Sequence, residues 1–336
     1  MDQQQHLHPE DLTSFAIQTF GHDYRPAGLT RLYGGAQKVI YDVAFTNGFH
    51  CLLYIWDISQ NFFKEEIEEA DRAWHSYGAD LFALNHDFLT RHGIPTPALY
   101  ALNRERERYS FDYAFVEYVT GPKLETYLTE PGTGSASGPS ASAKPDELME
   151  QFADIVKRMH GIKGFAYGQA VADNVNAADQ SIPCHRHQLM NAEQQLAYAA
   201  RHLEEAAANR DRLLKKLYEL ESRIAPRRAY GFIHGELGPD HVIVKNDAEL
   251  YLIDIEGASF YDVEHEHGFL HLRFGEHYEW LRDESIDPAR LAFYQLHHYL
   301  SLTAGGLKLQ QRGFHDQALA RGIMESNLRR ALQFVG

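Results

Sequence analysis

The stretch from residue 230 to residue 266 places the strongest constraint on how this chain folds. It contains two short apolar runs, His241–Lys245 and Leu250–Asp254, separated by the pair Asn246-Asp247. This pattern is typical of a β-hairpin, because asparagine and aspartate readily adopt the backbone that tight turns need. We therefore expect an antiparallel hairpin in the second half of the chain.

Acidic residues flank this hairpin. Glu236 lies in a loop rich in glycine and proline before the first strand, Asp254 ends the second strand, and Glu256 follows two positions later. Carboxylate oxygens are the ligands that Mg²⁺ prefers, and tight loops let the backbone approach phosphate groups. The sequence therefore predicts a site for a divalent metal and a phosphate beside the hairpin.

Composition excludes several classes of protein. The 336 residues are 44% hydrophobic and 24% charged, as in ordinary globular proteins. A net charge of −15 argues against nonspecific nucleic-acid binding, which needs a basic surface. No apolar run is long enough to span a membrane, and the polar N-terminus has no signal-peptide pattern. With only Cys51 and Cys184, a disulfide framework is not expected, which favours the cytoplasm.

The first part of the chain is expected to be rich in β-structure. Residues 1–24 are expected to form an N-terminal extension with a short amphipathic helix, and residues 25–119 a β-rich lobe. Within that lobe, Asn47-Gly48 joins two β-rich runs, which indicates a second hairpin. A helix over residues 80–92, stopped by glycine and proline, precedes two more strands.

The second part, residues 120–336, is expected to be mostly helical. It begins with a flexible loop at residues 129–145, which contains mainly Gly, Ser, Pro and Ala and too few apolar side chains to pack. Apolar residues then recur at helical spacing in most of the segments that follow. The acid-flanked hairpin interrupts these helices, so we expect the site to lie in this part.

Three short motifs connect these elements to a known family. Residues 234–237 read His-Gly-Glu-Leu, with His241 five positions beyond Glu236, and residues 253–256 read Ile-Asp-Ile-Glu. Asp262 and Glu266 form a further acidic pair. These motifs and the order of the elements resemble the aminoglycoside phosphotransferase and choline-kinase-like family, relatives of the protein kinases.

The resemblance implies a protein-kinase-like, two-lobed α+β fold, with a small antiparallel β-rich N-terminal lobe and a mostly helical C-terminal lobe. It implies transfer of the γ-phosphate of ATP or GTP to a hydroxyl of a small molecule, with Mg²⁺, or Mn²⁺, as the metal. The residues that it marks are Glu236 and His234 for catalysis, Asp254, His241 and Glu256 for the metal, and Gly34, Gly35, Lys38, Glu117 and Val119 for the nucleotide.

The sequence departs from the family pattern at three positions. Glu236 replaces the catalytic aspartate, and a displacement of about 1 Å in a catalytic group can cost on the order of 10²-fold in rate. His241 replaces an asparagine, and imidazole suits Zn²⁺ or Mn²⁺ better than Mg²⁺. Tyr54 lies where the family has its phosphate-binding lysine. Lys38 on the preceding strand is the substitute, but strand alternation does not determine on which face of the sheet its side chain lies.

Two alternatives therefore accompany the phosphotransferase. The first is a pseudokinase that binds a nucleotide or a partner without transferring phosphate. The second is a metal-dependent hydrolase, because His267 and His271 share one face of an expected helix. The zincin pattern His-Glu-x-x-His is absent, since Gly268 follows His267, so helix-face solvation is the simpler explanation of this pair.

Overall fold

We describe the protein from a computed structural model, which covers residues 7–33, 36–69, 77–129, 145–170 and 181–336. Contacts divide the chain into two compact units, each described by itself below. Unit 1 comprises residues 1–123 and 242–257, and unit 2 comprises residues 124–241 and 258–336. The acid-flanked hairpin, which the sequence placed within the helical part, therefore belongs to unit 1 by its contacts.

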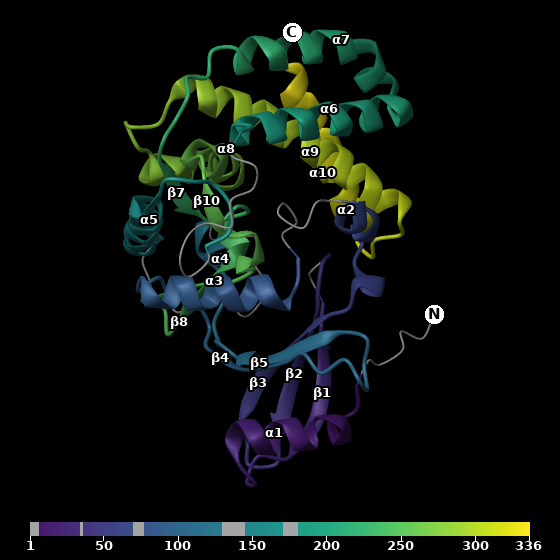
Figure 1. Ribbon diagram of the computed structural model, residues 1–336, viewed down its shortest axis with the longest axis vertical. Helices are drawn as coiled ribbons and strands as arrows, with labels where there is room; N and C mark the ends of the chain where they lie inside the picture. Colours follow the sequence, from purple (N-terminus) through teal and green to yellow (C-terminus); the bar gives the residue numbers. More distant parts are fainter. Residues whose placement is uncertain (1–6, 34–35, 70–76, 130–144, 171–180) are drawn as a thin grey trace. The chain divides into compact units, whose positions relative to one another are not determined.

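Unit 1 is built on a five-stranded antiparallel sheet with the order β1-β2-β3-β5-β4 (Figure 1). Its strands are β1 (Pro26–Leu32), β2 (Val39–Phe45), β3 (His50–Trp56), β4 (Leu99–Asn103) and β5 (Asp112–Glu117). Its helices are η1 (Pro9–Leu12), α1 (Thr13–Phe20), η2 (Ile58–Gln60), α2 (Lys64–Glu69) and α3 (Ala79–Arg91). The predicted β-rich first part is confirmed.

Strand alternation gives the sheet of unit 1 two different faces. Odd-numbered residues of β2 and β3, such as Val43 and Leu53, are buried in a core shared with α1. Even-numbered residues face the other way, because the Tyr54 and Trp56 rings pack edge-on or tilted against Phe82 of α3. Helices α1 and α3 therefore cover opposite faces, and any even-numbered side chain of β2 lies on the α3 face.

The predicted hairpin is β8 (Val242–Lys245) and β9 (Glu249–Leu252), followed by η4 (Ile255–Gly257). Asn246 and Asp247 both have positive φ, as a tight hairpin turn requires. The second strand ends at Leu252, two residues earlier than predicted. Asp254 therefore lies in the loop after the strand, with φ of 61°.

Gly121 allows the end of the β5 segment to pass close to the hairpin. It has φ of 156°, and a Cβ at this position would lie 2.0 Å from the backbone oxygen of Val244. Val244 N–H donates to Pro122 O at 2.9 Å, and Lys123 pairs with Ile243. Only glycine fits between these two backbones.

Unit 2 is mostly helical, as predicted. Its helices are α4 (Leu124–Leu128), α5 (Pro145–Gly161), α6 (Cys184–His202), α7 (Glu204–Glu221), η3 (Pro239–His241), α8 (Val263–Phe274), η5 (Gly275–Leu281), α9 (Pro288–Gln311) and α10 (Gln317–Leu332). Its one described sheet has the order β10-β7-β6, formed by Ser259–Tyr261, Tyr230–Ile233 and Lys163–Gly164. The long helix α9 packs against α6, α8 and α10 (Figure 1).

Two further predictions can be compared with the structure. Cys51 and Cys184, the two cysteines of the chain, are both buried free thiols. Most of the loop predicted at 129–145, and both Gly34 and Gly35, lie outside the described residues. Among the helices that the structure describes, none combines the length and the apolar character needed to cross a bilayer.

Candidate active site

Lys38, Asp254 and Glu256 form a compact ionic cluster in unit 1. Lys38 Nζ donates to Asp254 Oδ1 and to Glu256 Oε1, both at 2.7 Å. Trp56 Nε1 donates to the same Glu256 oxygen at 3.2 Å. The sequence placed all three charged residues at the site, and the structure brings them into direct contact.

The register of the sheet explains why Lys38 reaches this cluster. Lys38 precedes β2 by one residue and is even-numbered, so it shares the α3 face with Ile40. Ile40 pairs with Tyr54 of β3, and Lys38 Nζ lies 5.0 Å from the centre of the Tyr54 ring. The ammonium group of Lys38 therefore lies beside the position where the related family carries its lysine.

The charges of this cluster are strongly coupled. Burial alone would lower the pKa of Lys38, but Asp254 and Glu256 outweigh it and raise that pKa above its usual range. Burial also raises the pKa of the neighbouring Tyr54 hydroxyl, so the phenol stays neutral. Lys38 is thus a permanent cation at physiological pH, held by two carboxylates.

The two carboxylates differ in exposure. The Asp254 side chain is 40% exposed, whereas the Glu256 side chain is 9% exposed. Asn85 of α3 fixes the backbone between and around them, because its amide donates to Ile255 O at 2.8 Å and to Glu256 O at 3.1 Å. Asp254 is therefore accessible to solutes, and Glu256 is an internal anchor.

The loop that carries His234 and Glu236 lies in unit 2, after β7. His234 N–H and Gly235 N–H donate to the two oxygens of Glu266, at 3.1 Å and 2.8 Å. Glu266 is fully buried and also accepts from His160 Nε2 at 2.7 Å. The Glu266 carboxylate therefore fixes the loop through the loop's backbone and leaves the Glu236 side chain exposed.

The environment of Glu266 keeps it ionised. Burial would raise its pKa, but the hydrogen bond and the charge of His160, with the His234 N–H, outweigh burial and lower that pKa. An anion with three donors around it holds its geometry well. His234 itself is buried and contributes its backbone to this arrangement.

His241 closes the same loop from its other end. Its Nδ1 lies 2.7 Å from Glu236 O, and because a carbonyl only accepts, Nδ1 carries the proton. Nε2 is then the nitrogen that could ligate a metal, as predicted for this residue. The neighbouring carboxylate of Asp240 accepts from Arg273 at 2.5 Å, and its pKa is lowered because His241 and Arg273 outweigh its burial.

Glu117 is already committed to contacts within unit 1. Its N–H donates to Ala98 O at 2.8 Å, and its carboxylate accepts from Ala98 N–H at 3.1 Å and from Lys245 Nζ at 3.2 Å. These bonds hold the end of β5 between β4 and β8. Val119, which follows, is buried, and its backbone stays the predicted contact for a nucleobase.

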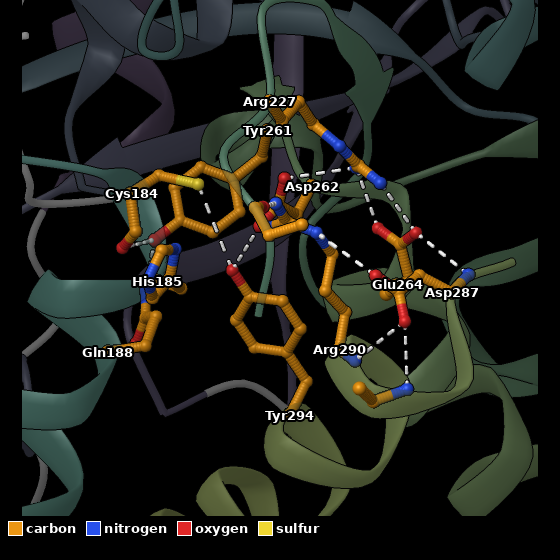
Figure 2. Close-up of polar contacts among 12 residues, drawn as sticks. Cys184, His185, Gln188, Arg227, Tyr261, Asp262, Glu264, Asp287, Arg290 and Tyr294 are labelled. Atoms are coloured by element: carbon orange, nitrogen blue, oxygen red, sulfur yellow. Dashed lines mark hydrogen bonds and ion pairs between the residues drawn. The ribbon is translucent and has the colours of Figure 1, made fainter. Parts of the chain in front are cut away.

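A buried ionic network holds the start of α8 and the start of α9 together (Figure 2). Asp262 accepts from Arg227 at 3.0 Å, from Arg290 at 2.6 Å and from the Tyr294 hydroxyl at 2.7 Å. Arg227 also forms two bonds of 2.7 Å to Glu264. Asp262, the first acid of the pair noted in the sequence, therefore binds two side chains of α9.

His267 and His271, the pair behind the hydrolase alternative, do not form a metal centre. His267 is buried beside Tyr278, with Nδ1 3.0 Å from the phenol oxygen, and burial lowers its pKa to about 4. His271 is exposed. Within the described part of the chain, no third histidine, cysteine or carboxylate joins these two, so we do not pursue a hydrolase.

The sequence did not indicate several residues that support the cluster and the loop. Four side chains bind partners that are far away in sequence, namely those of Trp56, Asn85, Arg227 and Arg290. One signal was present for Arg290, because an arginine in the first turn of a strongly apolar helix needs a buried acid. No comparable local signal marked the other three.

Three solved structures share this fold over almost the whole chain. A thermostable mutant of aminoglycoside phosphotransferase APH(4)-Ia has 16% identity and a TM-score of 0.60, with 95% of this chain and 98% of that chain covered. Spectinomycin phosphotransferase APH(9)-Ia has 13% identity and a TM-score of 0.63, with 98% and 99% covered. LicA has 12% identity and a TM-score of 0.60, with 97% and 98% covered.

These likenesses confirm the predicted protein-kinase-like α+β fold. At the level of sequence, residues 70–302 match the profile of the Phosphotransferase enzyme family, whereas no match was found among curated proteins. Because the profile covers more than half of the chain, the chain belongs to the Phosphotransferase enzyme family.

Proposed function

We propose that this protein transfers the γ-phosphate of a nucleotide, ATP or GTP, to a hydroxyl of a small molecule. The observation that carries the proposal is the cluster in which one lysine joins two carboxylates of different exposure. Solved structures of the same fold support it: APH(9)-Ia was solved with ADP and spectinomycin, and APH(4)-Ia with AMP-PNP and hygromycin B.

Asp254 is the proposed ligand for Mg²⁺. Hard carboxylate oxygens fit this ion. Because the Asp254 side chain is 40% exposed, an ion can reach its carboxylate without any rearrangement of the protein. When bound at Asp254, Mg²⁺ would supply positive charge that offsets the negative charge of the nucleotide phosphates. Positive φ at Asp254 turns its side chain out of the strand direction, and aspartate tolerates this backbone better than most residues.

Glu256 was predicted as a metal ligand, but its surroundings favour a different role. It is buried, and one of its oxygens already accepts from both Lys38 and Trp56. We assign Glu256 to holding Lys38 in place, so that the ammonium group meets the phosphates of a bound nucleotide. The phosphate-binding lysine is then supplied by the start of β2 instead of by β3, with its charge beside Tyr54.

Glu236 is the proposed base for the acceptor hydroxyl, and His234 positions it through the backbone. The loop around Glu236 is fixed by Glu266 and by the hydrogen bond from His241. A carboxylate that projects from a fixed loop can orient a hydroxyl and accept its proton late in the transfer. The extra methylene of glutamate is accommodated because the side chain is exposed.

Transfer of label from γ-phosphate-labelled ATP or GTP to a panel of hydroxyl compounds tests this function. Asp254→Asn should abolish transfer, because the amide cannot replace the charge of a metal-binding carboxylate. Asp247→Asn is the matched control, since Asp247 has a similar positive φ but lies in the hairpin turn. Nucleotide binding without transfer to any acceptor would instead support the pseudokinase, and unchanged transfer by Asp254→Asn would refute the assigned metal role.

A further inference from the structure

Three histidines of unit 2 lie together where α8 meets α9. His265 belongs to α8, and His297 and His298 belong to α9. Each residue offers one ring nitrogen, and these three nitrogens lie within 4.8 Å of one another. His297 and His298 are 4% and 5% exposed, so the cluster lies inside the protein.

Hydrogen bonds define which ring nitrogens of the two α9 histidines carry protons. His298 Nε2 lies 2.8 Å from the backbone oxygen of His265, which can only accept, so Nε2 is the donor. His297 Nε2 lies 3.3 Å from Asn191 Oδ1, which also accepts from the Ser301 hydroxyl. In both rings the lone pair is therefore on Nδ1.

Two of the cluster's nitrogens have no hydrogen-bond partner among the described residues. These are His297 Nδ1 and His265 Nδ1, and both atoms are buried. A buried polar atom without a partner is destabilising, and native proteins rarely contain one without a reason. A metal ion would satisfy both lone pairs at once.

The protonation of the cluster suits metal binding. Burial, followed by the charges of the neighbouring histidines, lowers the pKa of His265 and His297 well below the usual range. Burial lowers the pKa of His298 to about 4. All three rings are therefore neutral at physiological pH, and a metal would displace no proton from them.

We propose that His265, His297 and His298 bind a divalent transition-metal ion, with Zn²⁺ as the reference ion. Imidazole nitrogen suits Zn²⁺, Ni²⁺ and Cu²⁺, whereas Mg²⁺ and Ca²⁺ need oxygen. Tetrahedral Zn–N bonds of about 2.0–2.1 Å place ligand nitrogens roughly 3.3 Å apart, which modest rotations of the rings reach. Three protein ligands leave the fourth position for water.

The backbone of α8 at Gly268 lies close to the His298 ring. A Cβ on Gly268 would lie 3.1 Å from His298 Cδ2, so a glycine here lets the ring approach α8. The contacts from His298 to the His265 carbonyl and from His297 to Asn191 orient both rings, as hydrogen bonds to metal-bound histidines usually do. The ion would therefore join α8 to α9.

The cluster shares no residue with the proposed phosphotransfer site, but one of its histidines is connected to the residues that fix the loop of Glu236. His265 is the chain neighbour of Glu266, which fixes the loop of His234 and Gly235. Its ring also packs edge-on against Tyr294, whose hydroxyl binds Asp262. A metal that joins the two helices would stabilise the residues that fix the catalytic loop.

Elemental analysis of the untagged protein, purified without chelator, tests the proposal. We expect about one transition-metal ion per chain in the wild type, and near-complete loss in His297→Asn and His298→Asn. His267→Asn is the matched control, because His267 is buried on α8, the helix that carries His265, but its ring contacts Tyr278. This control should keep its metal.

A second measurement uses only the wild-type protein and so does not depend on a variant that folds. After chelation, Co²⁺ is titrated in and the visible absorption of a tetrahedral nitrogen site is recorded, followed by its displacement with Zn²⁺. Absence of both bound metal and this absorption would overturn the proposal, as would equal metal content in His297→Asn and the wild type. Metal content is measured independently of catalysis, so failure of the phosphotransfer proposal would leave this result unaffected.

Discussion

Replacing Lys38 by methionine is the perturbation whose consequences follow most directly from the structure. Methionine keeps the apolar stem of the side chain but removes the ammonium group. Glu256, with 9% of its side chain exposed, would then keep Trp56 as its one side-chain donor among the residues that the structure describes. Asp254, with 40% exposed, would be hydrated by solvent.

The expected cost follows from these two exposures. Removing one partner of a buried ion pair costs about 3–5 kcal/mol, because the other charge stays buried and uncompensated. An exposed pair contributes about 0–1 kcal/mol. Because Trp56 keeps one hydrogen bond to Glu256, the lower end of the first range applies. We expect Lys38→Met to lower the free energy of unfolding by about 3 kcal/mol.

Urea unfolding of four proteins measures this cost: the wild type, Lys38→Met, Glu256→Gln and the double variant. The double variant buries no unpaired charge at Glu256, so it should be more stable than the sum of the single effects predicts, by at least about 1.5 kcal/mol. Additive effects, or a cost of less than about 1 kcal/mol for Lys38→Met, would refute the buried ion pair.

Two further predictions concern the backbone of unit 1 and the loop of unit 2. Gly121→Ala should lower the free energy of unfolding by at least about 3 kcal/mol, because its Cβ would lie 2.0 Å from Val244 O. Gly28→Ala is the control: a Cβ there meets open space, so its free energy of unfolding should stay within about 0.5 kcal/mol of the wild type. Thermal or urea unfolding measures both. Glu266 has a lowered pKa, so its contribution to stability is present above the unfolded value near 4.5 and is lost as the pH falls through the folded value. Glu266→Gln should therefore have a lower free energy of unfolding than the wild type at neutral pH, and this free energy should fall less on acidification. If it falls as steeply with decreasing pH as in the wild type, this assignment is wrong.

The sequence predicted the order of elements and the position of the acidic hairpin because these features are local. A turn pair between two apolar runs and alternation within strands are readable without knowing what packs on them. Asp254 shows where local reading ends: the apolar run suggested a strand through residue 254, but the strand stops at Leu252 and Asp254 adopts positive φ. The side chain of Asp254 binds Lys38, which is 216 positions away, so its environment cannot be read from its neighbours in the sequence.

Lys38 itself shows what strand register adds. It lies one residue outside β2, so the sequence alone could not assign its face. The structure pairs Ile40 with Tyr54, which places the even-numbered residues of β2 on the α3 face of the sheet. Lys38 is also even-numbered, so its side chain lies on the same face. The histidine cluster was missed for the same reason, because His265 and the pair at 297–298 meet only through the packing of α8 on α9.

The affinity of Lys38→Met for ATP, compared with its affinity for adenosine, is the most direct test of the proposed role of this lysine. One lost charge-assisted contact of about 1.5–3 kcal/mol should weaken ATP binding roughly 10- to 100-fold and leave adenosine binding unchanged. Lys64→Met, which removes an exposed lysine paired with Glu68, should bind ATP like the wild type. If calorimetry gives the same ATP affinity for Lys38→Met and the wild type, Lys38 does not bind the phosphates, and the proposed site is wrong.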